Sequence, residues 1–243
     1  MSRILRMEWT KLCTATGVGW YALGIVAGTV VAGALACVTT HSSHCAPRPC
    51  TVDAIRVSLS GIYVGQMPAV VLAILVVGNE YDSMTIRTTL AASPRRIAVV
   101  VAKAGVSAAF VLAASALALA AALITARLIL PSRGFTAAHG YASLLSLADG
   151  PTRHAYLGTL VRIGLVALLG LGVAVIVRHT GAAITTTMGL LYLPPIVALF
   201  VTDPPWPSRI RRYAPMTADL RLLAAYAVAA VVVGAILFWR RDA

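Results

Sequence analysis

Six stretches of the chain are apolar and almost free of charge, and shorter polar segments separate them. These stretches are residues 17–38, 57–78, 97–126, 157–177, 182–202 and 222–239, with Arg162 in the fourth and Lys103 in the third. A helix needs about 20 apolar residues to cross a hydrocarbon layer about 30 Å thick. The pattern therefore predicts an all-α membrane protein with six transmembrane helices in a single domain of residues 1–243.

Composition agrees with a membrane protein. Apolar residues make up 59% of the chain and charged residues 12%, whereas soluble domains contain about 25% charged residues. The net charge of +12 is interpreted as contact with anionic lipid headgroups. Nucleic acid is not an expected partner, because no basic patch with interleaved aromatic residues lies on a soluble domain. The expected location is the cell membrane, with several passes.

The N-terminus could be mistaken for a signal peptide, because Arg3, Arg6 and Lys11 precede an apolar stretch that ends in ALAC. That stretch is 22 residues long, more than the roughly 7 to 15 apolar residues of a signal peptide, so we interpret it as the first transmembrane helix. With both termini inside, the 20 Lys and Arg residues divide equally between the two sides. The three basic residues at the N-terminus favour cytoplasmic termini.

A charged connector, GNEYDSMTIRTTLAASPRRIAVVVAK, joins the second and third apolar stretches at residues 78–103. Asn79 is predicted to cap a short helix over residues 80–90, with acidic residues in its first turn, where the positive helix end favours them. Ser93 and Pro94 are a second helix start signal. The long helix that follows passes Lys103, whose stem is expected to reach back to the headgroups. Residues 79–96 thus form a predicted loop with a short helix at the cytoplasmic surface.

This connector resembles the first cytoplasmic loop of ABC-2 type transporter permeases. The residues that carry the resemblance are Glu80, Thr85, Leu90, Pro94, Arg95, Arg96 and Lys103, in that order. RMEWTKL at residues 6–12 is similar to the amphipathic N-terminal helix of that family, here expected over residues 2–13. YAPMTADL at residues 213–220 is similar to the Pro-containing segment before the last helix.

The resemblance implies the membrane-spanning subunit of an ATP-driven ABC exporter, which moves a hydrophobic or amphipathic drug, peptide or lipid out of the cell. The short helix would be a coupling helix that docks on a separate ATPase subunit, present in two copies. A second permease subunit, identical or related, would complete the pathway. This chain has no G-x-x-x-x-G-K-S/T phosphate loop, so it is not expected to be an enzyme or to hold a cofactor. ATP and Mg would bind the partner ATPase.

The resemblance also assigns residues to these contacts. The ATPase-coupling residues would be Glu80, Tyr81, Asp82, Thr85, Arg87, Arg95 and Arg96, and the N-terminal helix would contribute Glu8, Trp9 and Lys11. Contact with lipid or solvent is the alternative for each charged residue. The alternative function is a membrane-bound resistance or immunity protein that binds its ligand without transport, and binding of a separate ATPase distinguishes the two.

Two other classes of protein find little support. A membrane-embedded enzyme would need a cluster of catalytic side chains, and Asp149 with His154 is the nearest approach to one. An ion-coupled carrier would need ionisable groups in the middle of the spans. The five His residues fall in loops or at the ends of spans, at positions 41, 44, 139, 154 and 179.

The outer loop HSSHCAPRPC, residues 41–50, places two Cys and two His close together. Cys45 and Cys50 are candidates for a disulfide, because the loop is expected to face an oxidising exterior. Free thiols are the second alternative. A zinc site that also uses His41 and His44 is the third.

Prolines and glycines mark further features. Pro194 and Pro195 predict a break near Leu193, and the family resemblance implies a re-entrant outer segment between the fifth and sixth helices. The pairs Gly24 with Gly28 and Gly61 with Gly65 indicate close helix packing, either between copies or within one chain.

PPWPSRIRRYAP at residues 204–215 is interpreted as an aromatic and cationic anchor to headgroups. Guidance of an amphipathic cargo is the alternative.

Overall fold

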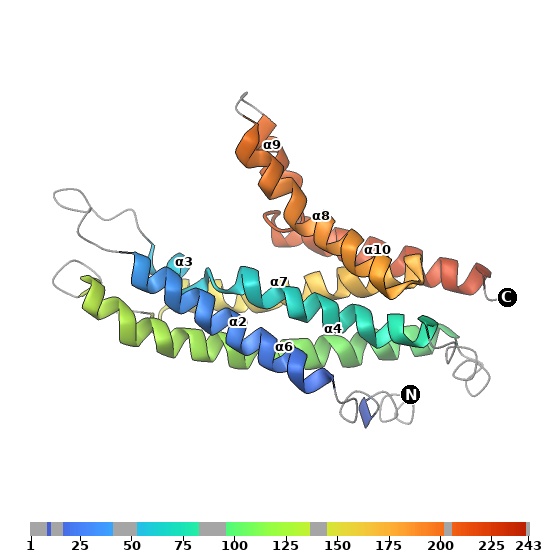
Figure 1. Ribbon diagram of the computed structural model, residues 1–243, viewed down its shortest axis with the longest axis horizontal. Helices are drawn as coiled ribbons and strands as arrows, with labels where there is room; N and C mark the ends of the chain where they lie inside the picture. Colours follow the sequence, from blue (N-terminus) through green and yellow to red (C-terminus); the bar gives the residue numbers. More distant parts are fainter. Residues whose placement is uncertain are drawn as a thin grey trace. The chain divides into compact units, whose positions relative to one another are not determined.

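The computed structural model describes residues 9–10, 17–40, 53–82, 96–136, 145–201 and 206–241 (Figure 1). Within these ranges the regular structure is helical and contains no β-strand. In chain order the helices are α2 (Val18–Thr39), α3 (Ala54–Leu59), α4 (Ile62–Asp82), α6 (Arg96–Ile129), the 3-10 helix η2 (Leu130–Arg133), α7 (Gly150–Val177), α8 (Thr180–Phe200), α9 (Trp206–Tyr213) and α10 (Leu220–Arg241).

Six helical stretches of the described chain are long and apolar enough to cross a membrane. They are Val18–Thr39, Ala54–Asn79, Val101–Arg133, Gly150–Val177, Thr180–Phe200 and Leu220–Leu237. The helical class and the number of candidate spans are therefore confirmed. Their length and composition are those of a multi-pass membrane protein.

The chain divides into two compact units. Unit 1 comprises Met1–Val18, Ala69–Val111 and Arg162–Ala243, and unit 2 comprises Gly19–Pro68 and Leu112–Val161. Helices α4, α6 and α7 each contribute one end to each unit.

In unit 2, one face of α2 packs against the start of α4. The buried residues of α2 are Ile25, Thr29, Gly33 and Cys37, spaced four apart, so they line one side of the helix. A methyl group added at Gly28 would lie 3.5 Å from the Val64 side chain, and one added at Gly24 would lie 3.3 Å from Pro68. The glycine pairs of these two helices thus pack within the chain.

The closest approach in this contact is at Gly61 and Gly65. A Cβ at Gly61 would overlap the Thr29 carbonyl oxygen and would lie 2.5 Å from the backbone nitrogen of Gly33. A Cβ at Gly65 would overlap the Thr29 hydroxyl, which donates a 2.7 Å hydrogen bond to Ile25 O. Only glycine lets the two backbones come this close.

A turn at Ser60 and Gly61 separates α3 from α4, so the apolar stretch predicted as one helix over residues 57–78 is divided. Asp53 begins α3 with its carboxylate, which accepts a 2.9 Å hydrogen bond from Ile55 N. Asp53 also lies 3.7 Å from Arg56, and this ion pair is exposed. The turn falls at Gly61, where the chain lies close to α2.

Helix α7 begins at Gly150, earlier than the predicted residue 157. Pro151 at the start of the helix removes an N–H that would have had no helical partner. The added turns are packed, because Thr152 and Tyr156 are buried. The Tyr156 hydroxyl donates a 3.1 Å hydrogen bond to Ser58 Oγ, and Ser58 in turn donates a 2.8 Å bond to Ile55 O. This pair ties α7 to α3 within unit 2.

In unit 1, α7 packs closely on α10 and on α4. A Cβ at Gly172 would lie 2.7 Å from the carbonyl carbon of Ala230, and one at Gly170 would lie 3.1 Å from Val70 Cγ1 and 3.4 Å from Ile74 Cγ1. Near the end of α4, a Cβ at Gly78 would overlap the Thr180 hydroxyl at the start of α8. Small residues therefore set the spacing of the helices in this unit.

The α7–α8 connection consists of two residues. Arg178 has a positive φ of 60°, which turns the chain sharply after α7. His179 then caps α8 by accepting a 3.3 Å hydrogen bond from Ala182 N at its Nδ1.

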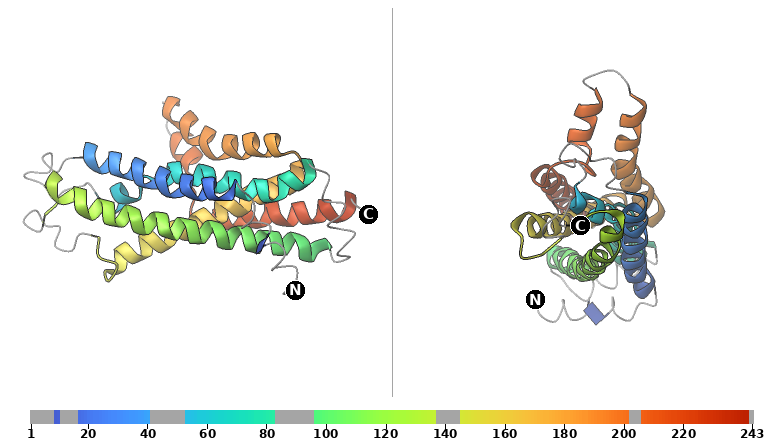
Figure 2. Two further views of the ribbon diagram at one scale, coloured as in Figure 1. Left: turned by 60° about the horizontal axis from the view of Figure 1, so that its bottom comes forward. Right: turned by 90° about the vertical axis from the view of Figure 1, so that its left-hand side faces the viewer.

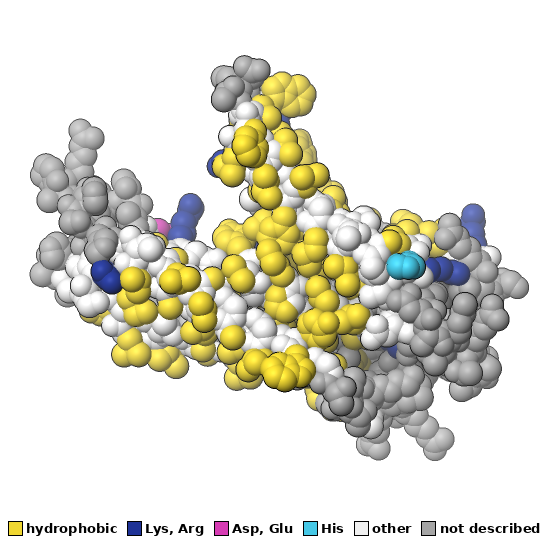
Figure 3. All heavy atoms as spheres, viewed as in Figure 1, with side chains coloured by type: hydrophobic (Ala, Val, Ile, Leu, Met, Phe, Trp, Pro, Cys, Tyr) yellow, Lys and Arg dark blue, Asp and Glu magenta, His cyan; other side chains and the backbone are white. Residues whose placement is uncertain are grey.

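The predicted break near Leu193 is wrong, because α8 is continuous from Thr180 to Phe200 and contains both Pro194 and Pro195. Each proline removes one backbone hydrogen bond of the helix. In hydrocarbon a full break would leave several polar groups without partners, so continuing the helix costs less. Exposed apolar side chains gather over the second half of α8, as Figure 3 shows.

After α8 the short helix α9 returns beside the end of α8 (Figure 2). The expected re-entrant segment stays a prediction.

The Gly61 contact yields a matched test. Gly61→Ala should lower the free energy of unfolding by about 1–3 kcal/mol, because the added methyl meets backbone atoms that cannot rotate away. Gly28→Ala is the control from the same contact, since its methyl would make an ordinary 3.5 Å contact. Thermal unfolding in detergent measures both. Equal stability of the two variants would mean that the helices are not this close.

The Tyr156–Ser58 hydrogen bond can be tested by a double-mutant cycle. Tyr156→Phe and Ser58→Ala should each destabilise the protein, and the double variant should lose less than the sum, with a coupling energy of about 0.5–1.5 kcal/mol. Chemical unfolding of the four proteins gives this value. A coupling energy of zero would exclude the bond.

Candidate functional site

Four of the seven predicted coupling residues fall at the ends of two long helices. Glu80, Tyr81 and Asp82 form the end of α4, and Arg96 is the first residue of α6. All four lie in unit 1, so the structure places both ends of the connector in one compact unit. Thr85, Arg87 and Arg95 lie outside the described residues.

The expectation for Asn79 is wrong. Asn79 is not the cap of a new helix, because α4 continues past it to Asp82. The acidic residues Glu80 and Asp82 therefore occupy the last turn of a long helix, not the first turn of a short one. The backbone continues in the helical form that the preceding apolar turns already have, since extending a helix costs less than starting another.

The expectation for Lys103 is also wrong. Its side chain is 3% exposed, so it does not extend to the headgroups. Ala102, Val106 and Ser107 are buried on the same side of α6, which shows that this face of the helix meets protein. Lys103 makes a polar or electrostatic interaction there. A buried cation in a span is expensive without such a partner, and this marks the position as a functional candidate.

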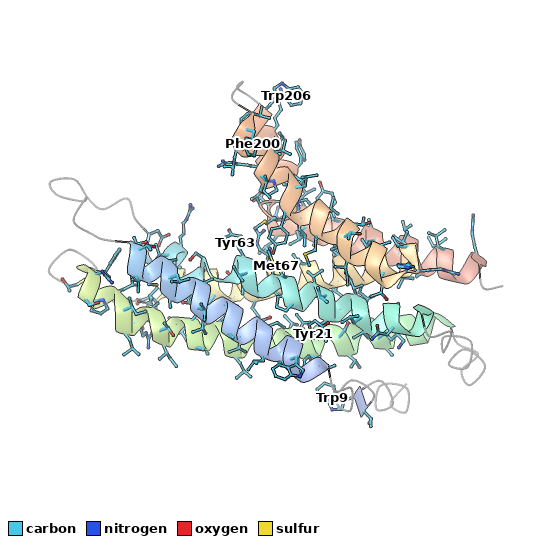
Figure 4. The ribbon with its side chains drawn as sticks, in the orientation of Figure 1. Trp9, Tyr21, Tyr63, Met67, Phe200 and Trp206 are labelled. Carbon is cyan, nitrogen blue, oxygen red and sulfur yellow. The ribbon has the colours of Figure 1, made fainter. Side chains whose placement is uncertain are left out.

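Of the other predicted residues, Trp9 is the one that the structure describes. Trp9 lies in a short helical piece of unit 1, and its side chain is 48% exposed. Figure 4 labels it near the N-terminal end of the chain. Glu8, Lys11, Cys45 and Cys50 lie outside the described residues. Cys37 is a buried free thiol. In the part of the chain that is described, no group of three His, Cys, Asp or Glu residues could hold a metal ion.

Arg162 forms a site that the sequence did not reveal. It lies inside α7 and is partly buried, and its guanidinium donates hydrogen bonds of 2.9 Å to Met216 O and 2.8 Å to Ala218 O. Both acceptors belong to the non-helical segment between α9 and α10. All of these residues are in unit 1.

That segment and Tyr213 at the end of α9 form a compact turn, residues 213–219. Ala214 and Ala218 are buried, and Ala218 N donates a 2.8 Å bond to Ala214 O. Tyr226 of α10 donates a 3.2 Å bond from its hydroxyl to Tyr213 O, and the Thr217 hydroxyl bonds Arg211 O. The 213–219 turn is therefore fixed from α7, α9 and α10.

In unit 2, Arg127 also donates a hydrogen bond to a backbone carbonyl of a non-helical segment. Its Nη2 donates a 2.7 Å hydrogen bond to Leu145 O, in the non-helical segment before α7. Each arginine thus satisfies carbonyl groups that a helix would otherwise have bonded. The partners are backbone atoms, which leave no trace in the sequence, although an isolated Arg in an apolar run was a signal that it bonds within the protein.

Comparison of the sequence with protein-family models, with curated proteins and with solved structures finds no match.

Replacement of Arg162 tests the importance of its contacts. Arg162→Met should destabilise the protein by about 2–4 kcal/mol, because two carbonyl groups lose a charged donor. Amide exchange should accelerate at Thr217, Ala218 and Leu223. Arg153→Met is the control, since Arg153 is exposed on the same helix. Unchanged exchange in the 213–219 turn would show that Arg162 does not hold it.

Proposed function

We propose that this chain is the membrane-spanning subunit of an ATP-driven ABC exporter, with hydrolysis on a separate ATPase subunit. The substrate class is hydrophobic or amphipathic: a drug, a peptide or a lipid. Two ATPase copies and a second permease subunit, identical or related, complete the assembly. The observation that carries the proposal is the charged connector, whose two ends continue directly into α4 and α6.

Because α4 is one continuous helix, it could carry a movement of the connector into the membrane-spanning part of the chain. A partner that moves the connector moves Glu80 and Asp82, and these residues share one rigid helix with the membrane-spanning turns below them. Rigid elements carry displacement that flexible loops would absorb. The 34-residue α6 continues from the other end of the connector in the same way.

Close contacts of α4 with α7 and α8 would pass this movement on to those two helices. Gly78 meets Thr180 at the start of α8, and Val70 with Ile74 meets Gly170 of α7. These contacts are too close to accommodate sliding without a shift of the neighbouring helix. Movement of α4 would therefore reach two further helices of unit 1.

The distribution of acidic residues favours an external energy source. The chain has eight of them: Glu8, Asp53, Glu80, Asp82, Asp149, Asp203, Asp219 and Asp242. Each lies outside or at the end of an apolar stretch, whereas a proton or cation relay needs carboxylates within the spans. ATP and Mg would bind the partner, and the chain itself would hold no cofactor.

Copurification is the first test. The tagged chain, extracted from its native membrane in mild detergent, should retain a phosphate-loop ATPase in stoichiometric amount. Recovery of the chain alone, with no ATP-dependent activity in native vesicles, would overturn the proposal and favour ligand binding without transport.

A double substitution tests the coupling site itself. Glu80→Gln with Arg87→Gln should weaken ATPase binding at least about tenfold, because charge-assisted hydrogen bonds contribute roughly 1.5–3 kcal/mol each. Binding to the purified ATPase measures this. Arg153→Gln is the control outside the connector. Unchanged ATPase binding and ATP-dependent transport by a correctly inserted double variant would refute the assignment.

A further inference from the structure

We infer that α9 lies at the membrane interface and binds the headgroups of anionic phospholipids. This inference does not depend on the proposed transport function. It is carried by the separation of side chains around α9, by their exposure, and by the contacts that hold α9 beside two candidate spans.

Helix α9 has two chemically distinct sides. Trp206, Ile210 and Tyr213 are spaced four and three residues apart and therefore share one side of the helix. Arg211 and Arg212 lie on the opposite side. Arg209 lies at the border, with its guanidinium 5.9 Å from the centre of the Trp206 ring, which is within range of a cation–π interaction.

Both sides are exposed. Trp206 is 57% exposed and Tyr213 is 59% exposed, and no residue of α9 is buried. The apolar surface continues onto the end of α8, where Phe200 is 80% exposed, and Figure 4 shows Phe200 and Trp206 at the same end of the α8–α9 pair. Aromatic side chains with a polar edge and an apolar body are typical of the membrane–water boundary.

The position of α9 restricts what can cover these surfaces. Helix α8 ends at Phe200 and α10 begins at Leu220, so α9 is joined at both ends to helices that are candidate spans. The Tyr226–Tyr213 and Arg162–Ala218 hydrogen bonds further hold its C-terminal end near α10 and α7. Helix α9 is therefore kept close to one face of the bilayer.

The positive charge of α9 favours anionic over neutral phospholipids as its partner. The helix WPSRIRRY contains three Arg and no acidic residue. A basic helix with Trp on its apolar side inserts that side at the headgroup boundary and attracts anionic lipids with the other. Phosphate and guanidinium also match in geometry. The occupant is thus a layer of anionic phospholipid, whose phosphates meet Arg209, Arg211 and Arg212 while the acyl chains meet Trp206.

The test uses the full chain with Trp206 as its only tryptophan, obtained by Trp9→Phe, Trp20→Phe and Trp239→Phe. The protein is reconstituted in vesicles of phosphatidylcholine and phosphatidylglycerol, with bromine placed high on the acyl chains of one lipid at a time. Trp206 fluorescence should be quenched, and brominated phosphatidylglycerol should quench more per molecule than brominated phosphatidylcholine.

Substitution and salt then identify the source of the preference. Arg211→Gln with Arg212→Gln should reduce the preference for phosphatidylglycerol, by roughly fivefold for each arginine at the surface. Arg240→Gln, an exposed arginine at the other end of α10, should leave it unchanged. In the unsubstituted helix, 1 M salt should also remove the preference, because the screening length falls to about 3 Å.

Absence of quenching by either brominated lipid would overturn the inference, because α9 would then be covered by water or protein. Equal quenching by the two lipids in the unsubstituted helix would also overturn it. As a check that needs no substitution, the lipids retained by the unmodified chain in mild detergent should be richer in phosphatidylglycerol than the membrane of origin. An unenriched lipid fraction would contradict headgroup selection.

Discussion

A backbone carbonyl or amide at membrane depth must find its hydrogen-bond partner within the protein, and this constraint shapes the candidate spans. It explains why α8 stays helical through Pro194 and Pro195. Where the chain leaves helical form next to a span, an arginine supplies the missing donor. Arg162 bonds Met216 O and Ala218 O, and Arg127 bonds Leu145 O. Two residues that look like misplaced charges are therefore structural donors.

Once the helices satisfy their own backbones, little hydrophobic force drives them together in lipid, and close packing must hold them. Glycine provides this at Gly61 in unit 2 and at Gly172 in unit 1, where the neighbouring backbone lies too close for a side chain. The glycine pairs noticed in the sequence could have joined two copies or two helices of one chain. In the structure Gly28 meets Val64 and Gly65, so this contact is made within one chain.

The sequence predicts the six apolar helices well, because a long run of apolar residues has few alternatives to a span. The sequence predicts less well those features that depend on packing between helices, such as turns and the direction in which a side chain faces. The turn at Ser60 and Gly61 interrupts an apolar run that is typical of one helix, and Lys103 lies on the buried side of α6 together with Ala102, Val106 and Ser107. Ser107, four residues after Lys103, was the available signal of a polar inner face. The partners of Arg162 could not be predicted, because carbonyl oxygens are the same at every residue.

The parts of unit 1 form a chain of contacts between the proposed coupling site and α9. The connector continues into α4, Val70 and Ile74 of α4 meet Gly170 of α7, and Arg162 of the same helix holds the 213–219 turn that follows α9. Each link is either a rigid helix, a close contact at glycine or a charged hydrogen bond. Such links transmit a shift because a packed contact must move as a whole or break. A partner that moves the connector would then also move the helix that we infer to bind lipid, so an exporter built this way would rearrange its headgroup contacts with each cycle.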